Sequence, residues 1–308
     1  MGGIMGRLRS WQLVAIGALA LSGAALAESV RITGRFPADY REPSFLKRMG
    51  VDRIDGPDGR ALGYALERAI GNRGHYSVVA GGADVDGILS GFVSTEINEA
   101  RVQQERENCV EKEKDQNGKE RCVRKEKQTI YCRQRTIDVS ADLRIARASD
   151  GRVVYSTRKP RQNAVTWCPG ESAPGAVDGV VRGLTDSIAE EVAREISPHT
   201  ETYAPRFYES REGMPKELHA RFKAAIIATQ RDLTGACAEF AALDQATPHF
   251  ALAYDTGICA EARGDYEAAI DAYRRAATLR PRDTADFNAS IDRVRKLIVQ
   301  RDDERARR

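Results

Sequence analysis

The spacing of apolar residues divides the chain into a first part of mixed secondary structure and a second part that is helical. Apolar and polar residues alternate in several short stretches of the first part, the pattern of half-buried strands. Two longer stretches repeat their apolar residues every three or four positions, which predicts helices. The predicted strands cover 30–32, 75–79, 86–97, 137–146 and 152–159, and the predicted helices cover 60–70 and 174–198. Between the first strand and the first helix we expect only a connection rich in Gly, Pro and Asp.

The second part, residues 214–300, has helical periodicity throughout, with a break around Pro248. A last helix is expected from about Asp283 to Val299, and the charged residues 301–308 are expected to be a disordered tail. Residues 201–213 are expected to link the two parts. The predicted fold class is α+β: a mixed α/β sheet domain over residues 28–200 with an extended β-hairpin, followed by an all-α domain of helical repeats.

The extended hairpin is predicted at residues 98–135, a stretch that is rich in charged residues. The turn sequence Asp115-Gln116-Asn117-Gly118 lies near its middle and favours two antiparallel strands. A two-stranded ribbon buries too little apolar surface to be stable alone. Its three cysteines could be metal ligands, reactive thiols or disulfide partners, and the compartment of the protein decides between these roles.

The compartment is indicated by residues 1–27, which have the three-part layout of a secretory signal peptide. Arg7 and Arg9 precede an apolar run that begins near Trp11, and small residues end at Ala27, after which cleavage is expected. A membrane anchor is the alternative, but it needs roughly 20 apolar residues and this run is shorter. The sequence therefore predicts export to the periplasm, with no transmembrane segment in the mature chain.

Removal of residues 1–27 leaves 281 of the 308 residues, and it removes two of the 48 basic side chains and none of the 45 acidic ones. A net charge near +1 (46 basic minus 45 acidic) gives no electrostatic attraction for nucleic acid, which is therefore not expected as a partner.

All six cysteines lie in the exported part, where an oxidising environment favours disulfides, and no close cysteine pair typical of zinc sites is present. Antiparallel elements bring residues at equal distances from their turn side by side, as a disulfide requires. Each cysteine has a partner at mirrored spacing about a turn. The predicted pairs are Cys109 with Cys122, Cys132 with Cys168, and Cys237 with Cys259. Six cysteines allow other connectivities, and the spacing does not exclude them.

The element order of residues 28–200 resembles the periplasmic α/β domain shared by the CsgG-like family and the amino-terminal domain of TolB. The likeness rests on the helix GRALGYALERAIG, the strands HYSVV and DGILSGFV, the hairpin DLRIARASDGRVVYS and the long closing helix. Those families usually place a helix between the second and third strands, where this chain has only AGGADVDG. The resemblance implies an envelope protein that works by binding and assembly, and it brings no catalytic residues.

The segment GICAEARGDYEAAIDAYRRAATLRP resembles a tetratricopeptide (TPR) repeat. The residues at the family's positions are Gly257, Gly264, Asp265, Tyr266, Ala269, Tyr273, Ala276 and Pro281. A weaker copy occurs 33 residues earlier, at Ala224, Asp232, Ala236, Phe240 and Pro248. Two repeats are few for an independent stack, so they are expected to dock on the α/β domain.

In TPR proteins the first helix of each pair lines a concave face that recognises partners. The resemblance therefore implies a partner-binding face that includes Arg221 from the weaker repeat and Tyr254, Ile258 and Glu261 from the clearer one. The alternative is that these side chains pack internally against the α/β domain.

No catalytic, cofactor-binding or metal-binding residues are predicted, because no phosphate-binding loop, serine-hydrolase elbow or metal-binding histidine motif occurs in the sequence. An enzyme is therefore not expected. The leading hypothesis is a periplasmic adaptor or scaffold of the cell envelope that binds protein partners through both domains. The alternative is a periplasmic sensor or carrier that holds a small molecule or a cell-wall fragment between the domains.

Overall fold

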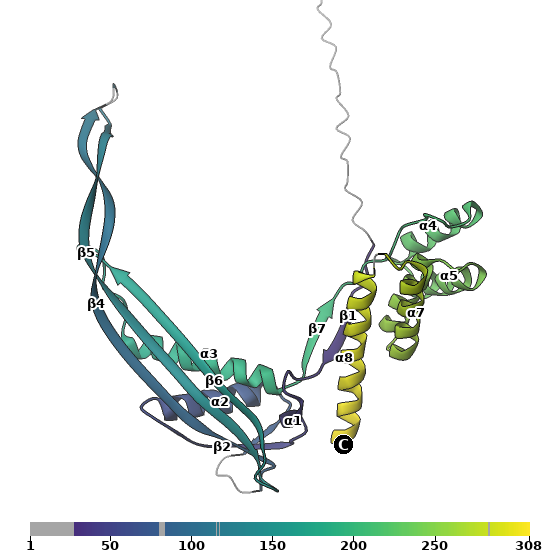
Figure 1. Cartoon of the computed structure of the whole chain (residues 1–308), viewed down its shortest axis with the longest axis horizontal. Helices are drawn as coiled ribbons and strands as arrows, with labels where there is room; N and C mark the ends of the chain where they lie inside the picture. The colour runs from purple at the N-terminus through teal and green to yellow at the C-terminus, as the bar shows by residue number, and fades with distance from the viewer. Residues whose placement is uncertain (1–27, 80–83, 115, 117, 283) are drawn as a thin grey trace, which may run out of the picture.

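The computed structural model describes residues 28–79, 84–114, 116, 118–282 and 284–308. The predicted signal peptide and the first four residues of the segment AGGADVDG lie outside this range. Figure 1 shows a curved sheet with a long ribbon on one side, a helical unit on the other, and two short strands between them. Sheets and helices both form large parts of the structure, which confirms the α+β fold class.

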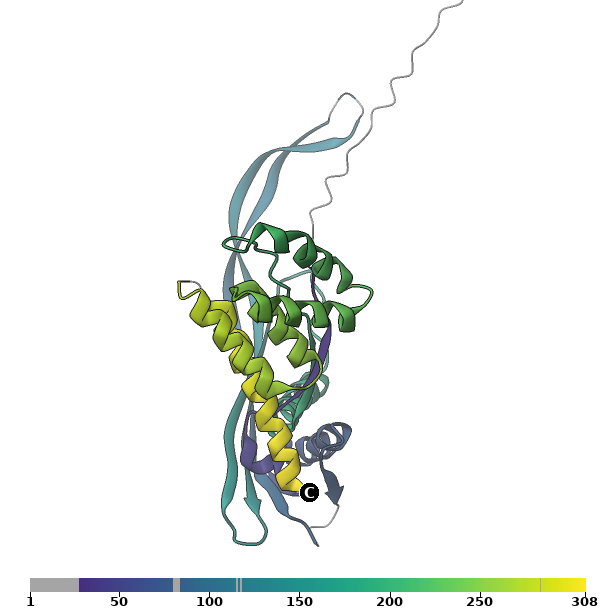
Figure 2. The same cartoon turned by 90° about the vertical axis from the view of Figure 1, so that its right-hand side faces the viewer.

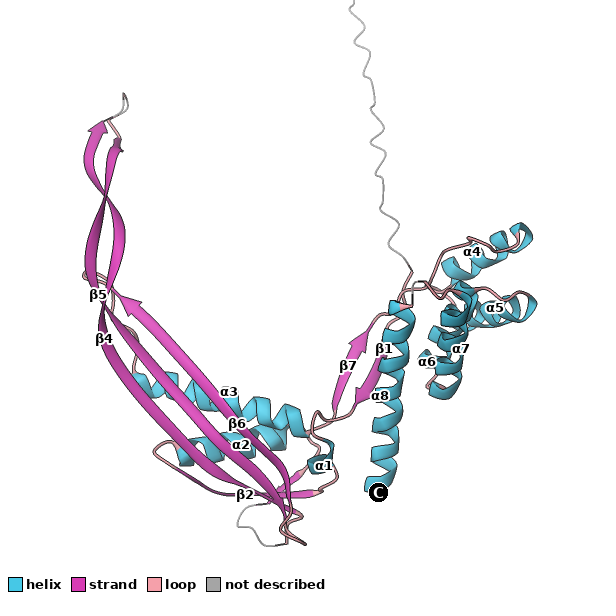
Figure 3. Cartoon of the chain, viewed as in Figure 1, coloured by secondary structure: helices cyan, strands magenta, loops and turns pink. Residues whose placement is uncertain are grey.

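Five strands form the main sheet in the order β3-β2-β4-β5-β6. Its strands are β2 (Arg48–Asp55), β3 (Ser77–Val79), β4 (Gly87–Lys114), β5 (Glu120–Arg147) and β6 (Val153–Trp167). β2 runs parallel to β3 and β4, whereas β4, β5 and β6 pair antiparallel. β4 and β5 continue past the end of β6 as the predicted ribbon (Figure 3).

The prediction of an irregular connection before residue 59 was wrong, because this stretch contains the short helix α1 (Arg41–Ser44) and strand β2. β2 buries Met49 and Ile54, but a register shift between Val51 and Ile54 breaks the alternation of inward and outward residues. The strand pairs with neighbours on both sides, and this pairing rather than a regular apolar pattern sustains it.

The core of the α/β domain lies between the sheet and two helices, α2 (Gly59–Asn72) and α3 (Val177–Ile196). Both helices pack on the same face of the sheet, where Leu66 and Val192 meet strand residues such as Ile145. The predicted helices at 60–70 and 174–198 correspond to these two elements. No helix in the described part of the chain packs on the opposite face of the sheet (Figures 1 and 3).

The first strand and the predicted linker pair with each other. β1 (Ile32–Phe36) runs antiparallel to β7 (His199–Tyr203) in a separate two-stranded sheet. The pairing continues through the hydrogen bond that the Phe207 amide donates to the Glu28 carbonyl, at 2.8 Å. Residues 201–213, predicted to link the two parts, begin within β7 and include the buried Phe207, so part of this segment is packed against the rest of the chain.

The helical unit contains α4 (His219–Ala228), α5 (Leu233–Ala246), α6 (Phe250–Ala262), α7 (Tyr266–Leu279) and α8 (Ala285–Arg307), with a 3-10 turn at Lys216–Leu218. Asp232 and Asp265 cap the starts of α5 and α7 by accepting hydrogen bonds from backbone amides. Aromatic residues such as Phe240, Tyr273 and Phe287 fill the core of this unit.

The prediction of a disordered tail at residues 301–308 was wrong, because α8 continues to Arg307. Figure 2 shows α8 running from the other helices toward the α/β domain. There the Arg41 Nε donates to the Asp303 carboxylate at 2.9 Å, and the Arg307 guanidinium donates to the carbonyls of Leu46 and His75 at 3.0 and 2.6 Å. These partners lie far away in sequence, so composition alone pointed to a solvated tail.

Three disulfides join Cys109 to Cys122, Cys132 to Cys168, and Cys237 to Cys259, and none of the six cysteines is free. These are the pairs predicted from mirrored spacing. A chain with all its cysteines in disulfides fits an exported protein, since such bonds persist in oxidising compartments. In the described ranges, no helix is both long and apolar enough to cross a membrane.

Candidate functional site

Three of the four predicted partner-binding residues are buried, so they cannot form an exposed recognition face. Tyr254, Ile258 and Glu261 are 5%, 0% and 1% exposed. α8 lies against this side of α6, where the Tyr254 hydroxyl and the Ser290 Oγ are 3.1 Å apart. The prediction for these residues was wrong because α8 and the segment after β7 occupy the concave side of the helix pair.

Glu261 is the centre of a buried polar cluster. Its carboxylate accepts hydrogen bonds from the hydroxyls of Tyr203 at 2.8 Å and Tyr273 at 2.6 Å, and from the Arg293 guanidinium at 2.7 and 2.8 Å. Burial and the negative charge of Glu261 raise the pKa of both tyrosines. Burial alone would lower the pKa of Arg293, but its hydrogen bonds with Glu261 outweigh this effect and raise it. The cluster therefore joins β7, α6, α7 and α8 through one buried carboxylate.

Arg221 lies at the surface of α4, where its Nε donates to Glu239 of α5 at 2.7 Å. Its side chain is 54% exposed, so it is accessible to a partner. Its predicted role in partner binding stays a prediction.

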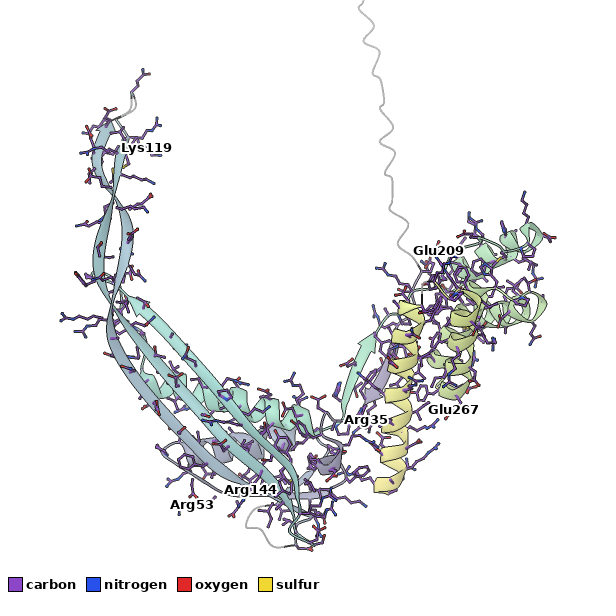
Figure 4. All side chains as sticks on the ribbon, in the orientation of Figure 1. Arg35, Arg53, Lys119, Arg144, Glu209 and Glu267 are labelled. Atoms are coloured by element: carbon purple, nitrogen blue, oxygen red, sulfur yellow. A yellow bond between two sulfur atoms is a disulfide. The ribbon has the colours of Figure 1, made fainter. Side chains whose placement is uncertain are left out.

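A hollow of about 610 Å³ lies at the junction of the two domains, between the β1–β7 pair and α8. Its lining includes Phe36, His199, Glu201, Asp292 and Lys296. His199 and Glu201 are 2.9 Å apart, and Arg35 of β1 lies beside α8, where it pairs with Glu304 (Figure 4). The hollow carries charges of both signs, which favours no single class of ligand.

The open face of the sheet carries a second shallow hollow, of about 700 Å³. Phe92, Asp142 and Arg158 occupy neighbouring positions on β4, β5 and β6. The Arg158 guanidinium contacts the Asp142 carboxylate at 3.9 Å, and the Arg144 Nε donates to the Ser90 Oγ at 3.3 Å. Charged side chains on this face, on which Figure 4 labels Arg53 and Arg144, thus have partners on the same face.

A third hollow, of about 460 Å³, lies at the base of the ribbon, where β6 ends and β5 continues. Arg101 of β4 is paired in register with Arg133 of β5, and Arg133 with Trp167 of β6. Tyr131 lies two residues along β5 on the same side and is 63% exposed. We define Arg101, Tyr131, Arg133 and Trp167 as the ribbon-base site.

The sequence analysis missed the ribbon-base site because it treated the charged residues of the ribbon as a solvated surface. The mirrored spacing that identified the disulfides could have found it. Arg101 and Arg133 each lie 16 residues from Asn117 in the turn, so a hairpin about that turn places them opposite each other. Two arginines opposite each other are unfavourable in a sheet. They are therefore a feature that needs an explanation.

Metal chemistry has no evident centre in the residues that the structure describes, where no group of three or more His, Cys, Asp and Glu side chains is placed to hold an ion.

No family model and no curated protein matches the chain. Among solved structures, the chain is similar to PelC dodecamers from Paraburkholderia phytofirmans. One aligns with 56% of this chain and 98% of its own at 15% identity and a TM-score of 0.26. The other aligns with 55% and 98% at 14% identity and a TM-score of 0.27. A PDZ domain protein from Parabacteroides distasonis aligns with 58% of this chain and 39% of its own, at 14% identity and a TM-score of 0.21. At TM-scores this low, these proteins give no guide to what this chain binds.

Proposed function

We propose that the chain is a non-enzymatic adaptor or scaffold of the periplasmic cell envelope, which binds protein partners chiefly through its α/β domain. The observation that carries this proposal is the ribbon. It projects from the sheet well clear of the helical unit (Figure 1), and none of its described residues beyond the base belongs to either hydrophobic core.

The ribbon is built as a stiff arm. The disulfide between Cys109 and Cys122 joins its strands near the tip. Ion pairs across the strands support it: Lys112 with Glu120, Arg124 with Glu111, Lys125 with Glu107, and Lys127 with Glu105. Each exposed pair contributes little to stability, about 0–1 kcal/mol. The cross-link stiffens an arm that lies outside both hydrophobic cores, and contact with another molecule best explains why such an arm is kept rigid.

Near the tip of this arm, two exposed apolar side chains interrupt the charged surface. Val110 and Val123 each follow one of the cysteines and are 47% and 46% exposed. An apolar centre with a polar rim is the usual composition of a protein–protein contact. The helical unit, which we propose to be TPR-like, would then hold the arm at a set position and offer Arg221 as a further contact.

The proposal is tested by site-specific photo-crosslinking in cells. A photoreactive amino acid is placed at Val123 on the ribbon, and a control is placed at Tyr64, which is 65% exposed on α2. We expect a discrete adduct of defined mass from the ribbon position and none from the control. Failure of Val110 and Val123 alike to give a discrete adduct would contradict the proposal.

A carrier for a small molecule or cell-wall fragment is the second candidate, favoured by the hollow of about 610 Å³ at the domain junction. Native mass spectrometry of protein purified from its own envelope separates the two functions. A co-purified small molecule, lost when Lys296 and His199 are replaced by Ala, would support the carrier.

A further inference from the structure

We propose that an extended, carboxylate-rich segment of a protein partner binds at the ribbon-base site, where it adds to the free edge of β5 and pairs its carboxylates with Arg101 and Arg133. This inference rests on the proposed adaptor function and names the chemistry of the partner.

The first observation is the pair of arginines. Arg101 and Arg133 are direct cross-strand neighbours, both are exposed, and neither has an ion-pair partner among the described residues. Most other arginines nearby do have one: Arg135 pairs with Glu99 and Arg106 with Glu171. Like charges placed opposite each other destabilise a sheet. A carboxylate between the two guanidiniums would remove this repulsion and form charge-assisted hydrogen bonds with each.

The second observation is the aromatic side of the site. Trp167 is partly buried beside Arg133, and Arg135 lies over the Trp167 ring at 5.6 Å, which fixes the ring from one side. Tyr131 is exposed at the other side of the hollow. Trp, Tyr and Arg are the residues most enriched at the energetic centres of protein interfaces. The site therefore combines charge recognition with rigid apolar contact area.

The third observation is the backbone edge. β6 pairs with β5 only as far as Trp167 opposite Arg133. Beyond that point, β5 from Glu120 to Cys132 pairs only with β4 in the described structure, so its other edge offers unpaired backbone groups. An extended polypeptide can continue the line of β6 along this edge, with main-chain hydrogen bonds giving affinity and side chains giving specificity. A sugar or a free phosphate lacks the regularly spaced amide and carbonyl groups that pair with such an edge, so the edge favours a polypeptide as the occupant.

The charges around the hollow support an acidic ligand. Glu171 is the one acidic residue in its lining, and its carboxylate is already engaged by Arg106 and by the backbone amide of Cys168 at 2.9 Å. The hydrogen bond from the Cys168 amide, followed by that from Arg106, lowers the pKa of Glu171 and keeps its carboxylate ionised. Because this negative charge is already paired with Arg106, it offers little repulsion to an acidic ligand. The disulfide between Cys132 and Cys168 anchors the loop that carries it.

The binding test uses Trp167 as the reporter, since the only other tryptophan, Trp11, lies in the predicted signal peptide. The mature chain is titrated with poly-L-glutamate, and Trp167 fluorescence is followed. We expect a saturable change for the native chain. We expect binding weakened by roughly tenfold or more when Arg101→Gln and Arg133→Gln are combined. The matched control is Arg144→Gln with Arg158→Gln, which removes the same charge from the open face of the same sheet and should leave binding unchanged.

Two further probes identify the occupant. Poly-D-glutamate has the same charge but cannot pair regularly with an edge of L-residues, so it should bind more weakly than the L-polymer; equal affinity would overturn the strand addition. Polygalacturonate presents carboxylates on sugars, and inorganic phosphate is a small anion. Binding of either one as tight as that of poly-L-glutamate would overturn the choice of a polypeptide.

A cellular test separates this inference from the proposed function. The photoreactive residue at Val123 is combined with the double change at Arg101 and Arg133. Loss of the Val123 adduct, at an unchanged melting temperature, is the expected result. An adduct that persists would refute the acidic segment while leaving the adaptor intact, whereas absence of any adduct in the native background would refute the adaptor itself.

Discussion

Glu261 of α6 and Arg293 of α8 form a buried ion pair with two hydrogen bonds, at 2.7 and 2.8 Å. The Glu261 side chain is 0% exposed and that of Arg293 is 22% exposed. Arg293 also lies over the ring of Tyr203 at 4.9 Å, so the pair joins β7 to the helical unit. Glu261, which the resemblance to TPR repeats assigned to a partner-binding face, is thus part of the connection between the two domains.

Replacement of Glu261 by Gln should destabilise the protein by about 3–5 kcal/mol, because Arg293 would keep its charge in a buried site without a counter-charge. The measurement is chemical denaturation followed by circular dichroism. Arg221→Gln is the matched control, since its exposed pair with Glu239 should contribute no more than about 1 kcal/mol. A small effect at Glu261, similar to that of the control, would contradict the account of this cluster.

The buried carboxyl of Asp255 should make the free energy of unfolding fall as the pH rises. Its carboxyl is fully buried, its Oδ1 accepts a hydrogen bond from the Tyr208 amide at 2.8 Å, and its Oδ2 has no partner in the described structure. Burial raises the pKa of Asp255 well above the usual 3.8. Above that pH the unfolded chain releases the proton and the folded chain retains it, so the free energy of unfolding falls as the pH rises.

The matching variant is Asp255→Asn, which keeps an acceptor for the Tyr208 amide and does not titrate. We expect the variant and the native protein to melt at similar temperatures near pH 4, with the variant increasingly the more stable toward pH 7. A melting-temperature difference that is constant over this range would show that Asp255 is ionised in the folded state.

The buried imidazole of His75 should make the free energy of unfolding fall as the pH is lowered, which is the opposite pH dependence. Its Nε2 donates to the Ser44 carbonyl at 2.8 Å, and its Nδ1 accepts from Arg307 at 3.3 Å, so the ring is neutral. Burial, together with the positive charges of Arg307 and Arg35, lowers the pKa of His75 from 6.5 to about 4, although the Ser44 hydrogen bond and Glu304 oppose this. As the pH falls from 6.5 toward 4, the unfolded chain takes up a proton that the folded chain does not, and stability is lost.

His75→Gln tests this effect, because a Gln amide can still donate to one partner and accept from the other. Melting temperatures measured from pH 7 to pH 4 should decline more steeply for the native chain than for the variant. Parallel curves would mean that His75 keeps a normal pKa and that Arg307 does not donate to it.

The disulfide between Cys132 and Cys168 should stabilise the α/β domain by roughly 4 kcal/mol in the chain-entropy account, given a sequence separation of 36. The double change Cys132→Ser with Cys168→Ser should therefore lower the melting temperature of the domain clearly. Cys109→Ser with Cys122→Ser is the control, because Cys132 and Cys168 are only 1% and 4% exposed whereas Cys109 is exposed on the ribbon, so loss of the Cys109–Cys122 bond should loosen the ribbon and change the melting temperature of the domain less. Equal effects of the two double changes would contradict this distinction.

Local patterns in the sequence were enough to predict several elements. The apolar repeat of α3 gave a helix close to its observed position, and the alternation on either side of Asp150-Gly151 gave the turn between β5 and β6, although β6 runs to Trp167, beyond the predicted end at residue 159. The cysteine pairs followed from their distances to turns, because an antiparallel pair brings together residues at equal distances from the turn. The same rule places Arg101 opposite Arg133, and this pair is the central feature of the ribbon-base site.

The tertiary structure decided which surfaces are free. The resemblance to TPR repeats placed Tyr254 and Glu261 on an exposed face, but α8, Tyr203 and the residues after β7 cover them. β2 lacks a regular apolar alternation and exists because neighbouring strands pair with both of its edges. The charged end of α8 is ordered by Arg41, Leu46 and His75, which lie more than 200 residues away in sequence. Periodicity shows which side of an element is apolar. Whether that side is buried depends on which distant segments pack against it, and a local stretch of sequence does not determine those contacts.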